Sequence, residues 1–321
     1  MKTSQRENTR PHEDFLGFQS DAIHLYEQGE LEQAMALIKK NASRFPDQAV
    51  QTENWRICIL SLQGKTDQAL ATMEDALRSG LWWSPEMLLE DPDLDALKGE
   101  PAFARLVERC AVRQAQALSA GAPQPLILSP QDNPPAPFPW LLVMHGRHSN
   151  AAFNAPYWSP VIHQGWLLAM AQSRQHVDSS NATWDDTERA IQDVRRQAER
   201  VMETHPADTD RLVLAGFSQG AGLAIRMSLS RALPARGWIA VAPYLPDVDW
   251  LVDHLESREG APARGYIILG EQDPLGQSFS QINDVLRQGG VEVEVERHAD
   301  LGHMYPQDFT ASLRRGLDFI L

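Results

Sequence analysis

Residues 216–220 read Gly-Phe-Ser-Gln-Gly, which has the residue types and spacing of a nucleophilic serine on a sharp turn. A short apolar run precedes the motif and a helical pattern follows it. A turn this tight strains the serine backbone and needs glycine on both sides, because a Cβ would collide with neighbouring backbone. The turn also lifts the hydroxyl clear of a sheet and aims a helix N-terminus at a developing oxyanion. We therefore predict that Ser218 is a nucleophile and that Gly216 and Gly220 form its elbow.

A serine nucleophile needs a general base, and on a strand–turn–helix elbow the base follows the nucleophile and the acid in the chain. His303 lies in a loop between the last strand pattern and the last helical pattern, where a base could hang over the serine. His298 ends the same strand pattern and is the alternative, while His254 is a more distant one. We predict His303 as the base.

The acid should follow the preceding strand, where its carboxylate would hold the imidazole in the correct tautomer. Asp273 lies in the turn directly after the apolar run 266–269. Glu271 in the same turn competes with it, and Asp247 and Asp249 follow an earlier strand pattern. The chain order favours Asp273.

The oxyanion donors should come from the residue after the nucleophile and from the loop after an earlier strand. The strand pattern 140–144 ends in His-Gly-Arg-His-Ser-Asn, so we predict the backbone N–H groups of Arg147 and Gln219 as donors. The candidate substrate-pocket residues are His148, Trp184, Phe217 and Met304. Trp158 and Trp166 read as core residues. The histidines and cysteines do not have the spacing of a metal site, and we expect neither a metal nor a cofactor.

These residues need a scaffold, and short apolar runs separated by helical patterns predict one. Continuous apolar runs are typical of parallel strands that are buried on both faces. Strands alternating with helices predict an α/β fold with a mostly parallel sheet, helices on both faces and a site beyond the carboxyl ends of the strands. The expected strands are 125–128, 140–144, 166–170, 211–215, 238–241, 266–269 and, near an edge, 291–295. The expected helices are 185–205, 221–231, 279–288 and 308–321.

The N-terminal third differs in composition: its residues are typical of helices, and it contains an internal repeat. Residues 29–34, Gly-Glu-Leu-Glu-Gln-Ala, recur at 64–69 as Gly-Lys-Thr-Asp-Gln-Ala, and this pattern resembles a degenerate tetratricopeptide repeat. Such a smaller all-α helical-repeat domain could bind a protein partner, or it could buttress the enzyme or form a homodimer. We expect a disordered N-terminus (1–14), a helical domain (15–117), a linker (118–123) and a catalytic α/β domain (124–321).

The charge composition limits the kinds of partner that the protein could bind. Lys and Arg number 29 against 43 Asp and Glu, a net charge of −14, which argues against nucleic acid as a partner. No apolar run is long enough for a transmembrane helix and the N-terminus has no signal-peptide pattern, so we expect no stable membrane insertion and a cytoplasmic location. The two cysteines do not make a disulfide framework.

Residues 144–146 (Met-His-Gly), 216–220, 270–274 and 302–303 (Gly-His) together resemble the phospholipase/carboxylesterase family of the α/β-hydrolase superfamily, which includes acyl-protein thioesterase-like enzymes. The resemblance covers roughly residues 124–321. It implies hydrolysis of small-molecule carboxylic esters or thioesters through an acyl-enzyme, with no cofactor.

The chain departs from that family's pattern in three places. Ala221 stands where a glycine often follows the elbow, Arg147 and His148 occupy the loop after the early strand, and the helical arm is extra. The last two leave the substrate open. A serine peptidase on the same fold is one alternative, although we find no lid or propeller segment for it. A non-catalytic protein that binds partners through the helical arm is the other.

Overall fold

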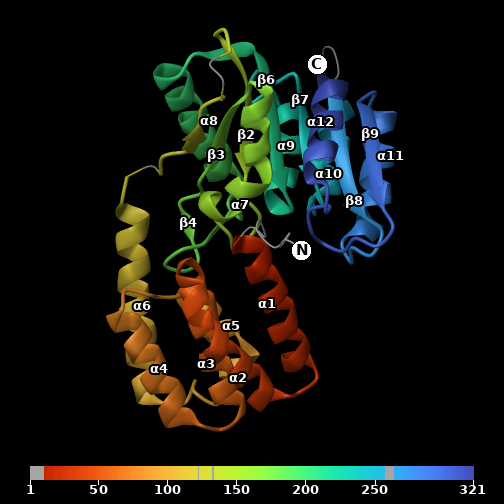
Figure 1. Ribbon diagram of the computed structural model, residues 1–321. Helices are drawn as coiled ribbons and strands as arrows, with labels where there is room; N and C mark the ends of the chain where they lie inside the picture. Colours follow the sequence, from red (N-terminus) through yellow and green to blue (C-terminus); the bar gives the residue numbers. More distant parts are fainter. Residues whose placement is uncertain (1–10, 122, 132–133, 257–263) are drawn as a thin grey trace, which may run out of the picture. The chain divides into compact units, whose positions relative to one another are not determined.

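The computed structural model describes residues 11–121, 123–131, 134–256 and 264–321. The chain divides into two compact units, of which the first contains Met1–Gly121 and His176–Asn181 and the second contains Ala122–Gln175 and Ala182–Leu321 (Figure 1). Of the N-terminus expected to be disordered, residues 1–10 lie outside the described residues, and helix α1 begins at Pro11.

The first unit consists of helices. They are α1 (Pro11–Glu27), α2 (Leu31–Asn41), α3 (Ala49–Leu62), α4 (Thr66–Arg78), α5 (Pro85–Glu90) and α6 (Pro101–Ser119), with 3₁₀ turns η1 (Ala42–Arg44), η2 (Pro46–Gln48) and η3 (Pro92–Leu94). Helix α6 therefore runs into the segment expected to be a linker.

The sequence repeat corresponds to two helical hairpins, α1–α2 and α3–α4. The repeated glycines, Gly29 and Gly64, have φ angles of +75° and +68°, a backbone conformation that favours glycine. The repeated alanines, Ala34 and Ala69, are fully buried in the second helix of each pair. The small side chain allows the two helices of a pair to approach closely.

The short segment His176–Asn181 packs into the helical unit although flanking residues belong to the second unit. Its backbone forms hydrogen bonds with the chain between α4 and α5, from Ser84 N to Val177 O (2.7 Å) and from Ser179 N to Trp82 O (2.9 Å). Nothing in the periodicity of the sequence indicates this.

The second unit is built on a seven-stranded sheet. Its strands are β1 (Leu126–Leu128), β2 (Phe138–Met144), β3 (Leu167–Ala171), β6 (Ala207–Phe217), β7 (Gly237–Val241), β8 (Arg264–Gly270) and β9 (Glu292–His298), in the order β1-β3-β2-β6-β7-β8-β9. Only the β1–β3 pairing is antiparallel. The predicted mostly parallel sheet is confirmed, and β9 is an edge strand as expected. A separate two-stranded ribbon joins β4 (Gln175–His176) to β5 (Ala182–Thr183).

Helices cover the sheet. They are α7 (Ala151–Trp158), α8 (Thr187–Thr204), α9 (Gln219–Leu229), α10 (Val248–Glu256), α11 (Gly276–Gln288) and α12 (Phe309–Ile320), with a 3₁₀ turn η4 (Ser159–Gln164). Helices α8, α9, α10 and α11 pack against one another in succession, and α7 packs against α12. A core cluster of buried apolar residues lies between the sheet and the α8–α11 layer. None of the described helices has the length and apolar character needed to cross a membrane.

Candidate active site

The nucleophile elbow joins β6 to α9, and its geometry explains both glycines. A Cβ on Gly216 would lie 2.4 Å from the Gly220 carbonyl, and one on Gly220 would lie 2.3 Å from the Met144 oxygen. Ser218 itself has φ 54° and ψ −118°, a strained conformation for a residue with a side chain. The turn therefore accepts no side chain at either glycine and holds Ser218 at the carboxyl end of the strand.

Three loops bring Ser218, His303 and Asp273 into one hydrogen-bonded chain. His303 Nε2 lies 2.9 Å from Ser218 Oγ, and its Nδ1 lies 2.8 Å from Asp273 Oδ2. Because an ionised carboxylate only accepts hydrogen bonds, Nδ1 carries the proton and Nε2 is free to accept the serine proton. The other oxygen of the buried Asp273 accepts a bond from Leu275 N (2.8 Å), which fixes the carboxylate.

The alternative residues are engaged elsewhere or exposed. His298 bonds to Glu296 (2.7 Å), and His254 bonds to the Leu229 carbonyl (3.0 Å). Asp247 pairs with Arg226 at 3.0 Å, and Glu271 is exposed. The structure therefore joins the three residues that chain order favoured.

The two residues predicted to supply oxyanion donors are tied together by their side chains. Asp185 accepts a bond from Gln219 Nε2 (2.7 Å) and pairs with Arg147 at 3.3 Å. Burial raises the pKa of Asp185, but hydrogen bonds from Arg147 and other neighbours outweigh it, and the net pKa is lowered. The carboxylate therefore stays ionised and can hold both side chains.

The groups expected to bind an oxyanion are the backbone N–H groups of these two residues. Among the described residues, no acceptor takes a hydrogen bond from the N–H of Arg147 or Gln219. Sequence reasoning missed Asp185; its place just before a helix start, beside Trp184, was the available signal.

His145 and Trp184 hold the loop after β2. His145 Nδ1 bonds to the Gly146 carbonyl (2.8 Å), its Nε2 accepts from Ser173 N (3.3 Å), and its own carbonyl accepts from the Trp184 indole (2.8 Å). The two rings lie 4.7 Å apart. Trp184 is 3% exposed, so it supports this loop from inside.

The candidate pocket residues differ in how deeply they are buried and in what they contact. Trp184 lines a cavity of about 260 Å³, together with Gln219, Tyr244 and Leu245 among others. Phe217 packs against the His303 ring at 5.1 Å. His148 and Met304 are exposed, and His148 has a positive φ of 53°. Trp158 and Trp166 are buried, in agreement with the expected core role.

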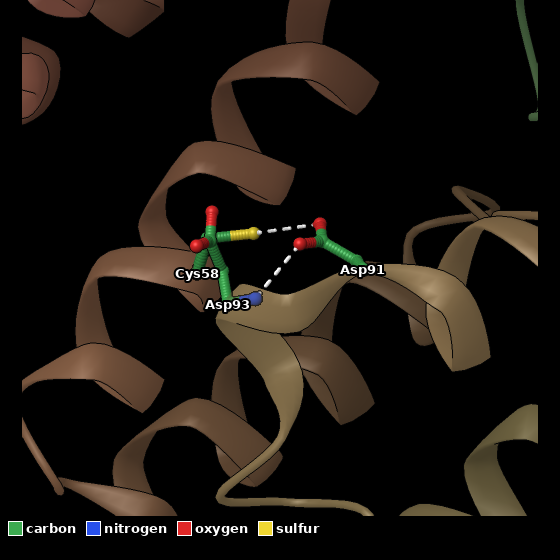
Figure 2. Close-up of side chains that lie close together, drawn as sticks. All are labelled: Cys58, Asp91 and Asp93. Carbon is green, nitrogen blue, oxygen red and sulfur yellow. Dashed lines mark hydrogen bonds between the residues drawn. The ribbon is translucent and has the colours of Figure 1, made fainter.

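A second cluster of polar side chains lies in the helical unit. Cys58, Asp91 and Asp93 have donor atoms within 4.8 Å of one another and form the group that could hold a metal ion among the described residues (Figure 2). Cys58 Sγ lies 3.5 Å from Asp91 Oδ2, Asp91 Oδ1 accepts from Asp93 N (2.9 Å), and the Tyr26 hydroxyl donates to Asp93. Burial, followed by the charges of Asp91 and Asp93, raises the pKa of the Cys58 thiol, which therefore remains protonated and can donate. These internal hydrogen bonds account for the arrangement without an ion.

Comparisons with known proteins agree with the two-part organisation. Residues 15–118 match the family model described as the A/B hydrolase-like N-terminal domain. A solved structure of an uncharacterized protein from Bacillus cereus is 26% identical, covers 95% of this chain and 98% of its own, and has a TM-score of 0.54. The solved esterase PE8 is 17% identical over 62% of this chain and 99% of its own, with a TM-score of 0.51. No curated protein sequence matches the chain. The first similarity spans nearly the whole chain, and the second is a similarity of fold alone.

Proposed function

We propose that this chain, an α/β-hydrolase with an A/B hydrolase-like helical domain at its N-terminus, is a serine hydrolase that cleaves carboxylic esters or thioesters. The observation that carries the proposal is the hydrogen-bonded chain from Ser218 through His303 to Asp273. Its members follow β6, β9 and β8, so they meet at the carboxyl ends of parallel strands. That edge is where such folds bind ligands.

The geometry suggests a two-step reaction. As Ser218 Oγ attacks the carbonyl carbon, His303 Nε2 takes its proton, and the negative oxygen is held by the N–H groups of Arg147 and Gln219. Collapse of this intermediate breaks the bond to the alcohol or thiol, which leaves with the proton from His303. Water then attacks the acyl-enzyme, gives its proton to His303, and releases the acid as the proton returns to Ser218. Throughout, Asp273 stabilises the imidazolium.

The cavity beside the elbow suggests a compact substrate. Its volume is about 260 Å³, and its wall combines Trp184 and Leu245 with the carboxylates of Asp185 and Asp247. This volume lies below the roughly 300–1,000 Å³ of ordinary small-molecule pockets, so we expect preference for short acyl groups. The fold shared with the solved esterase PE8 is consistent with ester chemistry.

The test is hydrolysis of p-nitrophenyl acetate, butyrate and palmitate by the wild type and by Ser218→Ala. We expect turnover of the short esters and a loss of about 10³-fold or more in kcat for the variant. A matched control is Ser228→Ala in α9, the helix that follows Ser218; it removes a buried hydroxyl that has no hydrogen-bond partner among the described residues. This variant should retain activity.

The two rival functions predict different outcomes. A wild type that hydrolyses no ester and takes no fluorophosphonate label would indicate an inert site and favour a partner-binding role of the helical domain. A protein that labels with fluorophosphonate but cleaves only peptide amides would favour a serine peptidase.

A further inference from the structure

The loop that carries His303 also carries a tyrosine that the proposed chemistry does not use. The Tyr305 hydroxyl donates to Asn154 Oδ1 (3.0 Å) and accepts from the Trp158 indole N–H (3.1 Å). Burial raises the pKa of Tyr305, so the phenol is neutral and can donate as well as accept. Both partners belong to α7, which follows the loop after β2.

Asn154 extends this connection to that loop. Its Nδ2 group donates to Ser149 Oγ (2.7 Å) and to the Asn150 carbonyl (2.9 Å), and the residue is 3% exposed. Two side-chain hydrogen bonds, from Tyr305 to Asn154 and from Asn154 to Ser149, therefore link the loop of the base to the loop that contains Arg147. Because the amide is buried, each of its bonds is costly to lose.

The Tyr305 ring makes a second connection. It is stacked on Tyr157 at 3.9 Å and on Phe217 at 4.7 Å between ring centroids. Phe217 precedes the nucleophile and also covers the loop after β2, because a Cβ on Gly146 would lie 2.9 Å from the Phe217 ring. The ring thus contacts the elbow directly and the loop after β2 through Phe217, in addition to lying on the same loop as His303.

We propose that Tyr305 is a positioning residue, which holds the His303 loop in register with Ser218 and with the Arg147 N–H. The inference rests on the proposed hydrolase function and deepens it. Residues 299–308 form no helix or strand; a backbone hydrogen bond from Gln272 N to Leu301 O (3.0 Å) holds the loop before His303, and the Tyr305 side chain holds it after His303. A displacement of about 1 Å of the base is enough to cost on the order of 10²-fold in rate.

The test compares two tyrosines that each bury a hydrogen-bonded hydroxyl. Tyr305→Phe keeps the ring stack and removes the hydrogen bonds to α7. The control is Tyr266→Phe in strand β8, which removes a hydrogen bond to Glu296 (2.6 Å). With p-nitrophenyl acetate, Tyr305→Phe should lower kcat about 10-fold or more with KM little changed, and should slow fluorophosphonate labelling equally. Tyr266→Phe should lose comparable thermal stability and keep kcat.

Asn154→Ala adds a second measurement that does not depend on the ring. It should lower kcat with KM retained, and combining it with Tyr305→Phe should cost less than the product of the two single effects, because both break one connection.

The outcomes separate the two proposals. If Tyr305→Phe melts at a lower temperature but keeps the wild-type kcat and labelling rate, Tyr305 is only structural and the positioning role is overturned. If the wild type itself neither hydrolyses esters nor takes the label, the hydrolase function fails and the positioning role fails with it.

Discussion

The two units contain the same local motif, an Asp-Pro turn, and use it differently. Asp91 in the helical unit and Asp273 in the sheet-containing unit are each followed by proline. In each turn, Oδ1 accepts the backbone N–H two residues on, Asp93 N at 2.9 Å and Leu275 N at 2.8 Å. The second oxygen remains for a tertiary partner, which is Cys58 Sγ at 3.5 Å in one unit and His303 Nδ1 at 2.8 Å in the other.

The partner decides what the turn can do. The Cys58 thiol is a weak donor with a raised pKa, and its one hydrogen is directed at Asp91 (Figure 2), so it has no second hydrogen to donate to another group. The imidazole of His303 has a second nitrogen, Nε2, which lies 2.9 Å from Ser218 Oγ. The Asp273 carboxylate can therefore act on the serine through the ring. An Asp-Pro turn by itself is therefore local structure, and its role depends on which side chain the fold places against the free oxygen.

The same substitution in both turns should give the largest contrast. Asp273→Asn should lower kcat by about 10²–10⁴-fold, because an amide can donate to Nδ1 and favour the wrong tautomer. Asp91→Asn keeps the cap on Asp93 N and should leave kcat unchanged. Ester hydrolysis under saturating substrate measures both, and equal kcat values for the two variants would refute the difference between the turns.

Glycine substitutions should give the second largest difference between the two units. Gly220→Ala would put a Cβ 2.3 Å from a backbone oxygen, so we expect a loss of several kcal/mol or no folded protein. Gly64→Ala meets no atom within 4 Å and strains only its positive φ, which should cost about 1 kcal/mol. Urea unfolding measures both free energies. A mild Gly220→Ala would contradict the close approach at the elbow.

Acid stability should show the smallest contrast. In the sheet-containing unit, burial raises the pKa of Glu296, but hydrogen bonds from Arg315, Ser312 and Tyr266 outweigh it and lower the pKa to about 2. A lowered folded pKa stabilises the fold above the ordinary glutamate range, and this stability is lost as the pH falls toward 2. Glu296→Gln should therefore cost about 1–3 kcal/mol at pH 7 and flatten the loss of stability between about pH 5 and 2.

Glu74 of the helical unit provides the comparison. It pairs with Arg109 at the surface, where solvent screens the interaction. Glu74→Gln should leave the acid unfolding curve nearly unchanged. An identical acid profile for wild type and Glu296→Gln would show that the Glu296 network does not contribute as expected.

Features with local signals could be predicted from the amino-acid sequence. Apolar runs predicted the parallel sheet, because a strand buried on both faces must be apolar along its length. Glycines at 216 and 220 predicted the elbow, because only glycine fits where backbones approach within contact distance. Chain order then selected Asp273 and His303 from several acids and histidines, and the repeat at 29–34 and 64–69 marked the two helical hairpins.

Contacts between residues far apart in the chain became known only from the folded protein. Tyr305 and Asn154 are 151 positions apart, and Gln219 and Asp185 are 34 apart. Segment 176–181 joins the helical unit from within the other unit's sequence. Such contacts involve single side chains or extended backbone, which leave no periodic pattern and no spacing rule. They arise when packing brings distant elements together, so they could not be derived before the fold was known.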